Sequence, residues 1–148
     1  MTTITRIKEL DLQALGGLRR ESSLAGCRFI ERLCDEWASG TNRFSAPGEA
    51  LFLATVGDQV VGVCGLNRDP YVPDPSVGRV RRLYVARAHR RGGVGRALLE
   101  AVLAHARAHF RLLRLRSEEA GEFYLTHGFR RIASEPDTTH VFEISHAA

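Results

Sequence analysis

Apolar residues in the first third of the chain recur at helical spacing, behind one short segment that resembles a strand. We expect this first strand at residues 3–8. Leucines three residues apart predict a helix at residues 11–22, where a Gly-Gly pair lowers the helix propensity. Apolar residues three and four apart predict a second helix at residues 28–38. A loop rich in Gly, Pro, Ser and Asn follows at residues 42–49.

The middle of the chain has the pattern of an antiparallel sheet. Two apolar runs at residues 50–56 and 59–66 are separated by a Gly-Asp dipeptide, which is typical of a β-hairpin. Residues 69–78 hold three of the five prolines and are expected to be irregular. A further strand is expected at residues 79–85. Period-two alternation predicts its two faces, with Val80, Arg82 and Tyr84 on one and Arg81, Leu83 and Val85 on the other.

The C-terminal half alternates helices with strands. Residues 94–110 have the strongest helical pattern, an apolar stripe at positions i, i+3, i+4, i+7 and i+11. The stripe comprises Leu99, Val102, Leu103, Ala106 and Phe110. A second helix is expected at residues 118–127, where Gly128 ends it. Strands are expected at residues 112–116, 130–134 and 140–144.

This order of elements, together with the composition, indicates the fold class. Antiparallel strands followed by βαβ alternation indicate an α/β (α+β) domain with a mixed sheet. The 148 residues suit a single domain over residues 1–148. With 44% hydrophobic and 26% charged residues, wholesale disorder and a coiled coil are excluded. No apolar run approaches the roughly 18 residues of a membrane span, and no secretory signal is recognisable, so we expect a cytoplasmic protein without a membrane partner.

Positive charge is concentrated in the middle of the chain. Residues 79–116 hold eleven arginines and one acid, a net charge of +10, while the remaining residues carry −6. The whole chain therefore has the net charge of +4. Such asymmetry indicates that an anionic partner meets this segment.

The segment between the strand at 79–85 and the helix at 94–110 has the composition of an anion site. From Arg90 to Arg96 it runs Arg-Arg-Gly-Gly-Val-Gly-Arg, so it permits a tight turn into the helix. Unpaired N–H groups at a helix start attract anions, which predicts a diphosphate cradle. A Walker A loop and a dinucleotide-binding loop are excluded, because the lysine of the first and the spacing of the second are missing. A plain glycine-rich turn with solvated arginines is the alternative.

Two motifs in series resemble the GNAT superfamily of acetyl-coenzyme A-dependent N-acetyltransferases. Arg90, Gly93 and Gly95 fill the coenzyme A signature Gln/Arg-x-x-Gly-x-Gly/Ala between a strand and a helix. The second signature, Ala-x-x-Phe-Tyr-x-x-x-Gly-Phe, is filled by Ala120, Phe123, Tyr124, Gly128 and Phe129. The resemblance covers residues 50–130. It implies a central, mostly antiparallel sheet with a splayed pair of strands, flanked by helices.

The resemblance also implies where acetyl-coenzyme A, the acyl donor, lies. Its diphosphate would meet the amides of residues 91–96. Its pantetheine arm would pair with backbone groups of Leu83 and Val85, where their strand bulges away from residues 112–116. The Val85 N–H would polarise the thioester carbonyl. The implied donor-binding residues are Leu83, Tyr84, Val85, Arg90, Arg91, Gly92, Gly93, Val94, Gly95 and Arg96.

The reaction implied by the resemblance is direct attack of an amine on the thioester. Tyr124 is the candidate proton donor to the departing thiolate, and a packing role for its ring is the alternative. Arg79 stands where some family members carry a glutamate base, and it cannot serve as a base. A chain of water molecules is one alternative base. The other candidates are Asp69, Asp74, Glu49 and His89.

Other partners and functions stay open at this point. No metal site is expected, because His105 and His109 share a helix face but the sequence places no third ligand. The acceptor is an amine of open identity, and a homodimer and a monomer are both compatible with the sequence. A non-catalytic acyl-coenzyme A sensor on the same fold is the first alternative function. A basic nucleic-acid-binding module is the second, disfavoured because its arginines lack interleaved aromatic residues.

Overall fold

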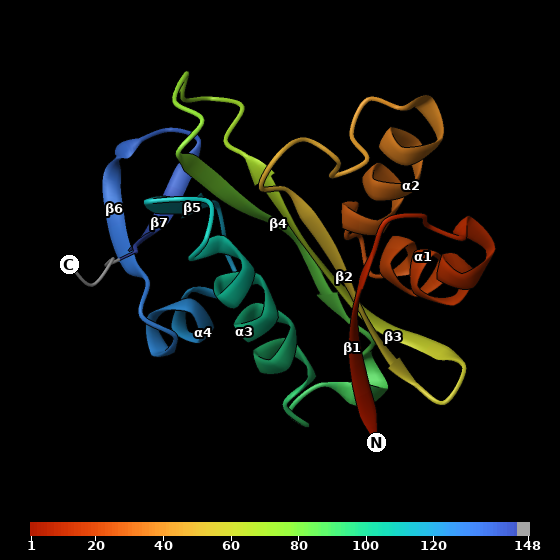
Figure 1. The fold of residues 1–148 in the computed structure, drawn as a ribbon. Coiled ribbons are helices and arrows are strands. Elements are labelled where there is room, and N and C mark those ends of the chain that lie inside the picture. Colours follow the sequence, from red (N-terminus) through yellow and green to blue (C-terminus); the bar gives the residue numbers. More distant parts are fainter. Residues whose placement is uncertain (145–148) are drawn as a thin grey trace.

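A seven-stranded mixed sheet forms the centre of the protein (Figure 1). The computed structural model describes residues 1–144. The strand order is β1-β2-β3-β4-β5-β7-β6, and β4 and β5 form its parallel pair. The predicted mixed sheet is confirmed. The strands are β1 (Thr2–Ile7), β2 (Ala50–Val56), β3 (Gln59–Arg68), β4 (Val77–Val85), β5 (Leu112–Leu115), β6 (Arg130–Glu135) and β7 (Thr138–Glu143).

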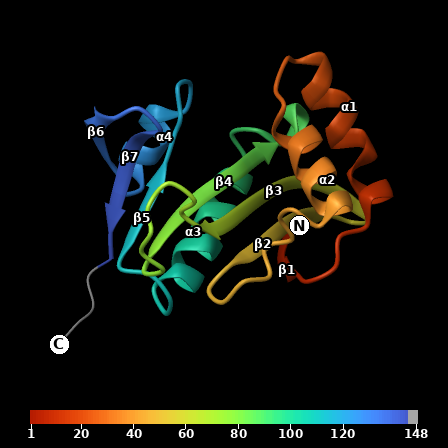
Figure 2. The ribbon, with the colours of Figure 1, turned by 90° about the horizontal axis from the view of Figure 1, so that it is seen from above.

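Helices lie against both faces of the sheet (Figures 1 and 2). They are α1 (Gly16–Leu24), α2 (Phe29–Ser39), α3 (Val94–Ala106) and α4 (Gly121–Thr126), with the 3-10 turns η1 (Leu12–Leu15) and η2 (Arg87–His89). Two neighbouring residues of β4 identify the faces. Tyr84 hydrogen-bonds to Glu21 of α1, whereas a Cβ placed on Gly95 of α3 would lie 3.7 Å from Val85 Cγ2. We call these two sides the α1–α2 face and the α3 face.

The apolar stripe of α3 holds this helix on the sheet. The residues of the predicted stripe are all buried: Leu99, Val102, Leu103 and Ala106 lie in α3, and Phe110 lies just beyond its end. β3 lies between helices on both faces, and its residues 61–67 are buried without alternation. Each fully buried large apolar side chain contributes about 1.5–3 kcal/mol. This packing fixes the start of α3 relative to β4.

The helix expected at residues 11–22 is divided in the structure. Its first part is the turn η1, where the Asp11 carboxylate accepts the Gln13 N–H at 3.0 Å. The regular helix α1 begins only at Gly16. The glycine pair therefore stands at the junction between the two pieces.

Two later helices are shorter than their patterns predicted. α3 ends at Ala106 instead of residue 110. α4 begins at Gly121 instead of residue 118, because Ser117 Oγ accepts the Ala120 N–H at 3.0 Å and holds a bend ahead of the helix. The shortening of α4 leaves Tyr124 in its middle turn.

Candidate active site

β4 and β5 run side by side for a short distance and then separate (Figure 2). Their parallel pairing joins residues 77–79 of β4 to residues 112–114 of β5. β4 continues to Val85, so its residues 80–85 have no paired strand on that side within the described chain. We call residues 80–85 the open edge. Such an edge presents backbone N–H and C=O groups that an extended ligand can pair with.

A β-bulge at Arg82 lies within the open edge. Arg81 pairs with Gly65 and Tyr84 pairs with Val63, so β4 has one residue more than β3 between these two pairs. Arg82 takes up the extra residue with a φ of 61°, a strained conformation that costs about 1–3 kcal/mol outside glycine. A bulge bends its strand and increases its twist. The bulge therefore accounts for the separation of β4 from β5.

The bulge also changes which way the side chains of β4 face. Alternation predicted Arg81 on the side of Leu83 and Val85, and that prediction is wrong. Arg81 pairs with Gly65, on the face of β3 that also pairs with Tyr84. The extra residue shifts the alternation by one position. Arg81 therefore lies on the α1–α2 face, while Leu83 and Val85 lie on the α3 face.

Backbone groups near the end of β4 point toward the unpaired side. The Ala86 N–H donates to the Val61 carbonyl of β3 at 2.7 Å. Because alternate residues of a strand direct their polar groups to opposite sides, Val85 and Leu83 direct theirs away from β3. The Val85 carbonyl accepts Arg90 Nε at 2.9 Å, which agrees with this direction.

The glycine loop brings the start of α3 to the end of the open edge. Gly93 has a φ of 85° and is the N-cap of α3, with no side-chain hydrogen bond at this cap. Arg91 also has a positive φ, of 66°. A Cβ placed on Gly95 would lie 3.7 Å from both Val85 Cγ2 and Phe123 Cζ. The start of α3, the end of β4 and α4 therefore meet at one place, which is the arrangement that the predicted cradle needs.

The three arginines of the loop differ in their contacts. Arg90 donates to Val85 and places its guanidinium 5.2 Å from the centroid of the Tyr84 ring. Arg96 pairs with Glu100 at 2.9 Å, and both side chains are exposed. Arg91 is exposed and forms no ion pair within residues 1–144. Arg91 is thus the loop arginine with the most freedom to meet a ligand.

Three other residues of the predicted donor site differ in exposure and direction. Gly92 is exposed at the loop surface, and Val94 is buried in the core beneath it. The Tyr84 hydroxyl donates to Glu21 Oε2 at 2.5 Å, and burial together with this bond raises the pKa of Tyr84 to about 12. The Tyr84 side chain therefore holds β4 against α1 and does not face the unpaired side.

α4 places two aromatic side chains in different surroundings. Phe123 lies at the glycine loop. Tyr124 is buried, with its ring centroid 5.4 Å from that of Phe129 and 6.1 Å from that of His140. Burial and the neighbouring Cys64 raise the pKa of Tyr124 above its ordinary value. Its hydroxyl forms no hydrogen bond within residues 1–144, so a protonated and unengaged donor is available.

Two of the candidate bases already have structural partners. Both carboxylate oxygens of Glu49 accept backbone N–H groups, at 3.1 and 2.9 Å. The Arg111 guanidinium and Ser76 lower the pKa of Asp74 to about 2. His89 lies in η2, next to the glycine loop. Asp74 is therefore too weak a base to take a proton from an ammonium group at neutral pH, and Glu49 is held in the loop ahead of β2.

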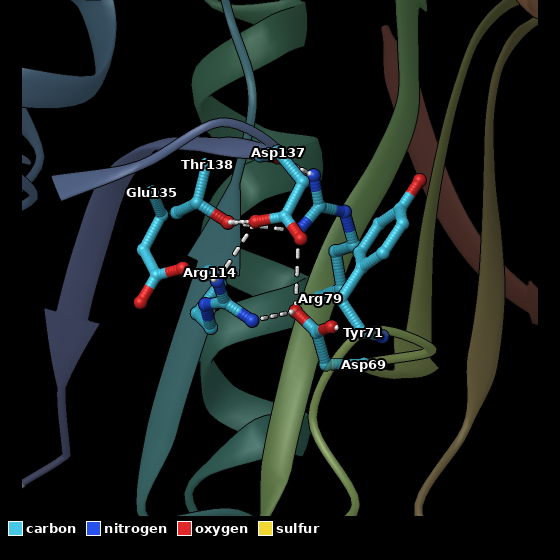
Figure 3. A network of polar contacts seen from close by, with 7 residues as sticks. All are labelled: Asp69, Tyr71, Arg79, Arg114, Glu135, Asp137 and Thr138. Carbon is cyan, nitrogen blue, oxygen red and sulfur yellow. Dashed lines mark hydrogen bonds and ion pairs between the residues drawn. The ribbon is translucent and has the colours of Figure 1, made fainter. Parts of the chain in front are cut away.

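Asp69, the remaining carboxylate, is buried between two arginines (Figure 3). Its Oδ2 lies 3.1 Å from Arg79 Nη1 and 3.3 Å from Arg114 Nη1. Its Oδ1 accepts the Tyr71 N–H at 2.8 Å. Arg114 also contacts the Asp137 carboxylate at 2.9 Å, and Arg79 donates to the Asp137 carbonyl. Asp69, Arg79, Arg114 and Asp137 thus form one network, and Glu135 joins it at 3.9 Å from Arg114 Nη2.

This charged network lies where the pairing of β4 with β5 ends, since Arg79 and Arg114 form the last pair. It joins β4, β5, the segment after β3 and the turn between β6 and β7 (Figure 3). Arg79 cannot serve as a base, and it forms part of a structural ion-pair network. The network fixes the point from which the two strands diverge.

Several acidic partners at the site were missed from the sequence. Glu21, Glu36 and Asp137 bind β4 or β5 from distant parts of the chain. The sequence did contain one indication of such partners, a single predicted strand with three arginines. Buried guanidinium groups require acidic partners. Nothing local in the sequence identifies which acids these are.

The splayed strands, the bulge and the glycine loop together define a GNAT-like acyltransferase fold. A family model described as an acetyltransferase (GNAT) domain matches residues 47–131. The chain belongs to this family of GNAT acetyltransferases, and the resemblance noted in the sequence is confirmed.

Solved structures agree with this assignment. A candidate acetyltransferase from Exiguobacterium sp. 255-15 has 29% identity and a TM-score of 0.85, over 97% of this chain and 93% of that one. A GCN5-related N-acetyltransferase from Kribbella flavida has 25% identity and a TM-score of 0.72, over 95% of each chain. An N-acetylglutamate synthase from Neisseria gonorrhoeae, complexed with coenzyme A and N-acetyl-glutamate, shares the fold at 16% identity and a TM-score of 0.73. That match covers 99% of this chain and 36% of the other.

A search of curated proteins finds no match. Within residues 1–144, no helix is both long and apolar enough to cross a membrane. The same residues contain no group of three or more His, Cys, Asp or Glu side chains that could hold a metal ion.

Proposed function

We propose that this protein transfers the acetyl group of acetyl-coenzyme A to a primary amine, by direct attack of the amine on the thioester. The observation that carries the proposal is the open edge of β4, which leads to the uncapped start of α3. The edge suits the amide groups of a pantetheine arm, and the helix start suits a diphosphate. The open edge and the helix start lie end to end, in the same order as the pantetheine arm and the diphosphate of the donor.

In this proposal the donor lies on the α3 face. Its diphosphate accepts hydrogen bonds from backbone N–H groups of residues 91–96, and Arg91 adds a positive charge. Its pantetheine arm runs along Leu83 and Val85 like an added strand. The Val85 N–H donates to the thioester carbonyl oxygen and stabilises the negative charge that develops there. Arg90 holds the end of β4 in position through the Val85 carbonyl.

The chemical step forms a C–N bond and breaks the C–S bond. A neutral amine attacks the carbonyl carbon, and its excess proton passes to water, since Asp69 and Asp74 are paired with arginines. The departing thiolate receives a proton from the Tyr124 hydroxyl, which is then reprotonated from solvent. Tyr124 suits this role because its hydroxyl is protonated at neutral pH and has no acceptor within the described chain.

The ion pairs around the site weigh against a nucleic-acid-binding module. Of the eleven arginines at residues 79–116, a majority pair with acidic side chains. The paired arginines are Arg79, Arg82, Arg96, Arg111, Arg114 and Arg116. Guanidinium groups engaged in this way are poorly placed to neutralise phosphates along a nucleic acid.

The proposal is tested by thiol release from acetyl-coenzyme A with a panel of amino acids, peptides and small amines. We expect release that depends on at least one amine, and a melting temperature that rises with coenzyme A and much less with adenosine. Binding of coenzyme A without release for any amine would favour the sensor. Absence of any thermal shift at a large excess of the donor would contradict the proposed site.

A further inference from the structure

Arg81 lies at the end of the open edge that is far from the glycine loop. Starting from the loop, Val85 and Leu83 come first along β4, and Arg81 follows beyond the bulge. It stands two residues past Arg79, the last residue of β4 that pairs with β5. Its side chain is on the α1–α2 face, whereas the glycine loop is on the α3 face.

The guanidinium of Arg81 is a half-buried cation without a partner. It forms no hydrogen bond or ion pair within residues 1–144, although it is only partly exposed. The charged groups that face it are Arg82 and Arg79 from β4 and Glu36 from α2, with Tyr71 beside them. Burial lowers the pKa of Arg81, and the two neighbouring arginines lower it further.

The acids around Arg81 are already taken by other arginines. Glu36 Oε1 lies 2.6 Å from Arg82 Nη2. Asp69 pairs with both Arg79 and Arg114, and the Asp137 carboxylate pairs with Arg114, as Figure 3 shows. The acids of this region thus pair with Arg79, Arg82 or Arg114, and Glu135, which is half exposed, is the fourth of them, 3.9 Å from Arg114 Nη2. None of these carboxylates forms an ion pair with Arg81 within residues 1–144, so its guanidinium stands unpaired beside the point where β4 and β5 separate.

We infer that Arg81 binds a carboxylate of the acceptor, so that the acceptor is a small amine that carries a carboxylate, such as a free amino acid. The inference rests on the proposed function. If the donor occupies the α3 face, the acceptor reaches the thioester from the α1–α2 face, next to Arg81. A guanidinium fork matches a carboxylate with two parallel hydrogen bonds. It repels a polyamine, and its charge favours the neutral form of the acceptor amine, which is the form that attacks.

The test compares amines that differ only in the carboxylate. Alanine, phenylalanine, methionine and aspartate are assayed beside their α-carboxamides for thiol release, with wild type, R81Q and R107Q. Arg107 is the matched control, because it is exposed at the end of α3 and forms no ion pair in the described part of the chain. The α-amino group of the carboxamide is less basic than that of the free amino acid, so more of it is neutral. If the carboxylate had no role, the carboxamide would therefore be the better substrate.

We expect wild type and R107Q to prefer the accepted acid over its carboxamide at least tenfold in kcat/KM. In R81Q the two should differ by less than about threefold, with coenzyme A affinity unchanged. Turnover without preference in wild type, or an unchanged preference in R81Q, overturns the role of Arg81 while the proposed function stands.

A binding measurement tests the inference without turnover. N-acetyl derivatives of the same amino acids and of their carboxamides are added to protein saturated with coenzyme A, and the melting temperature is recorded. In wild type and R107Q, we expect at least one of the acids to raise the melting temperature and the matching carboxamide to have little effect. In R81Q, neither compound should change the melting temperature. Equal shifts for acids and carboxamides, or no shift with any acid, overturn the inference. Coenzyme A binding without thiol release from any amine would instead contradict the proposed function.

Discussion

Two buried tyrosines, Tyr84 and Tyr124, differ in what their hydroxyl groups bind. Burial raises the pKa of both, so both remain protonated at neutral pH. Tyr84 donates to Glu21 at 2.5 Å and is committed to holding β4 against α1. The Tyr124 hydroxyl has no partner within residues 1–144. A hydroxyl without an acceptor in the described part of the protein is available to donate to a ligand, which favours Tyr124 as the proton donor.

Tyr124→Phe tests this at the scale of one oxygen atom. We expect kcat to fall by about 10–100-fold, the low end for a general acid, because a thiolate leaves readily. The KM for acetyl-coenzyme A should change little, since the hydrogen bond strengthens only as charge develops on sulfur. Steady-state kinetics with an accepted amine provide the measurement. The free energy of unfolding is the control, and it should stay within about 1 kcal/mol because no protein hydrogen bond is lost. A kcat within twofold of wild type would leave Tyr124 a packing role.

At the scale of elements, the strands and helices could be predicted from periodicity, but the geometry of β4 could not. Alternation along β4 assigned Arg81 to the wrong face, because the bulge depends on how β4 pairs with β3 and leaves no local pattern. The partners of β4 are also remote in sequence. Glu21 is 63 residues from Tyr84, and Glu36 is 46 residues from Arg82. The glycine loop could be predicted because its function depends on consecutive residues.

Gly95→Asp separates the stability of α3 from its proposed ligand. A Cβ at this position would meet its neighbours at ordinary contact distance, 3.7 Å, so the side chain fits. An acid in the first turn of a helix is favourable to its dipole, so the melting temperature of the unliganded protein should not fall. Affinity for coenzyme A should weaken at least tenfold, about 1.4 kcal/mol, because a carboxylate stands where the diphosphate binds. Calorimetric titration measures this, with Gly95→Ala as the uncharged control. Equal affinities for the two variants would place the diphosphate elsewhere.

Asp69→Asn tests the charged network between β4 and β5. The substitution leaves the buried Arg79 without a paired carboxylate, while Arg114 keeps Asp137, and breaking a buried pair costs about 3–5 kcal/mol. Urea denaturation should show a loss of this size. Asp74→Asn is the matched control, because its pair with Arg111 is exposed to solvent, and we expect a clearly smaller loss for this variant. Similar losses for the two variants would mean that the network does not hold the strands together.

At the scale of the whole molecule, the buried His140 and the half-buried His105 connect stability to pH. Burial lowers the pKa of His105 and of His140, with Arg6 and Arg131 among the further causes. The folded protein therefore binds fewer protons near pH 6 than the unfolded chain, whose histidines titrate at about 6.5. The contribution of these two histidines to the free energy of unfolding is complete above about pH 6.5. It is lost as the pH falls below that value.

The melting temperature should accordingly fall as the pH is lowered from 7.5 to 5.5. The melting temperature of His140→Gln should fall less steeply over the same range. The stability contributed by carboxylates with lowered pKa values, such as Asp74, is complete above about pH 4 and is lost only below it, so these groups do not change the melting temperature in this window. A melting temperature that stays level or rises on acidification would show that the folded state accepts these protons.

The central claim is that acetyl-coenzyme A lies along the open edge of β4 and over the start of α3. Hydrogen–deuterium exchange with and without excess acetyl-coenzyme A tests it most directly. We predict slower exchange in peptides that cover residues 83–96, including the Val85 amide, and unchanged exchange at the turn between β2 and β3. Protection confined to other segments, with residues 83–96 exchanging as in the free protein, would contradict the account.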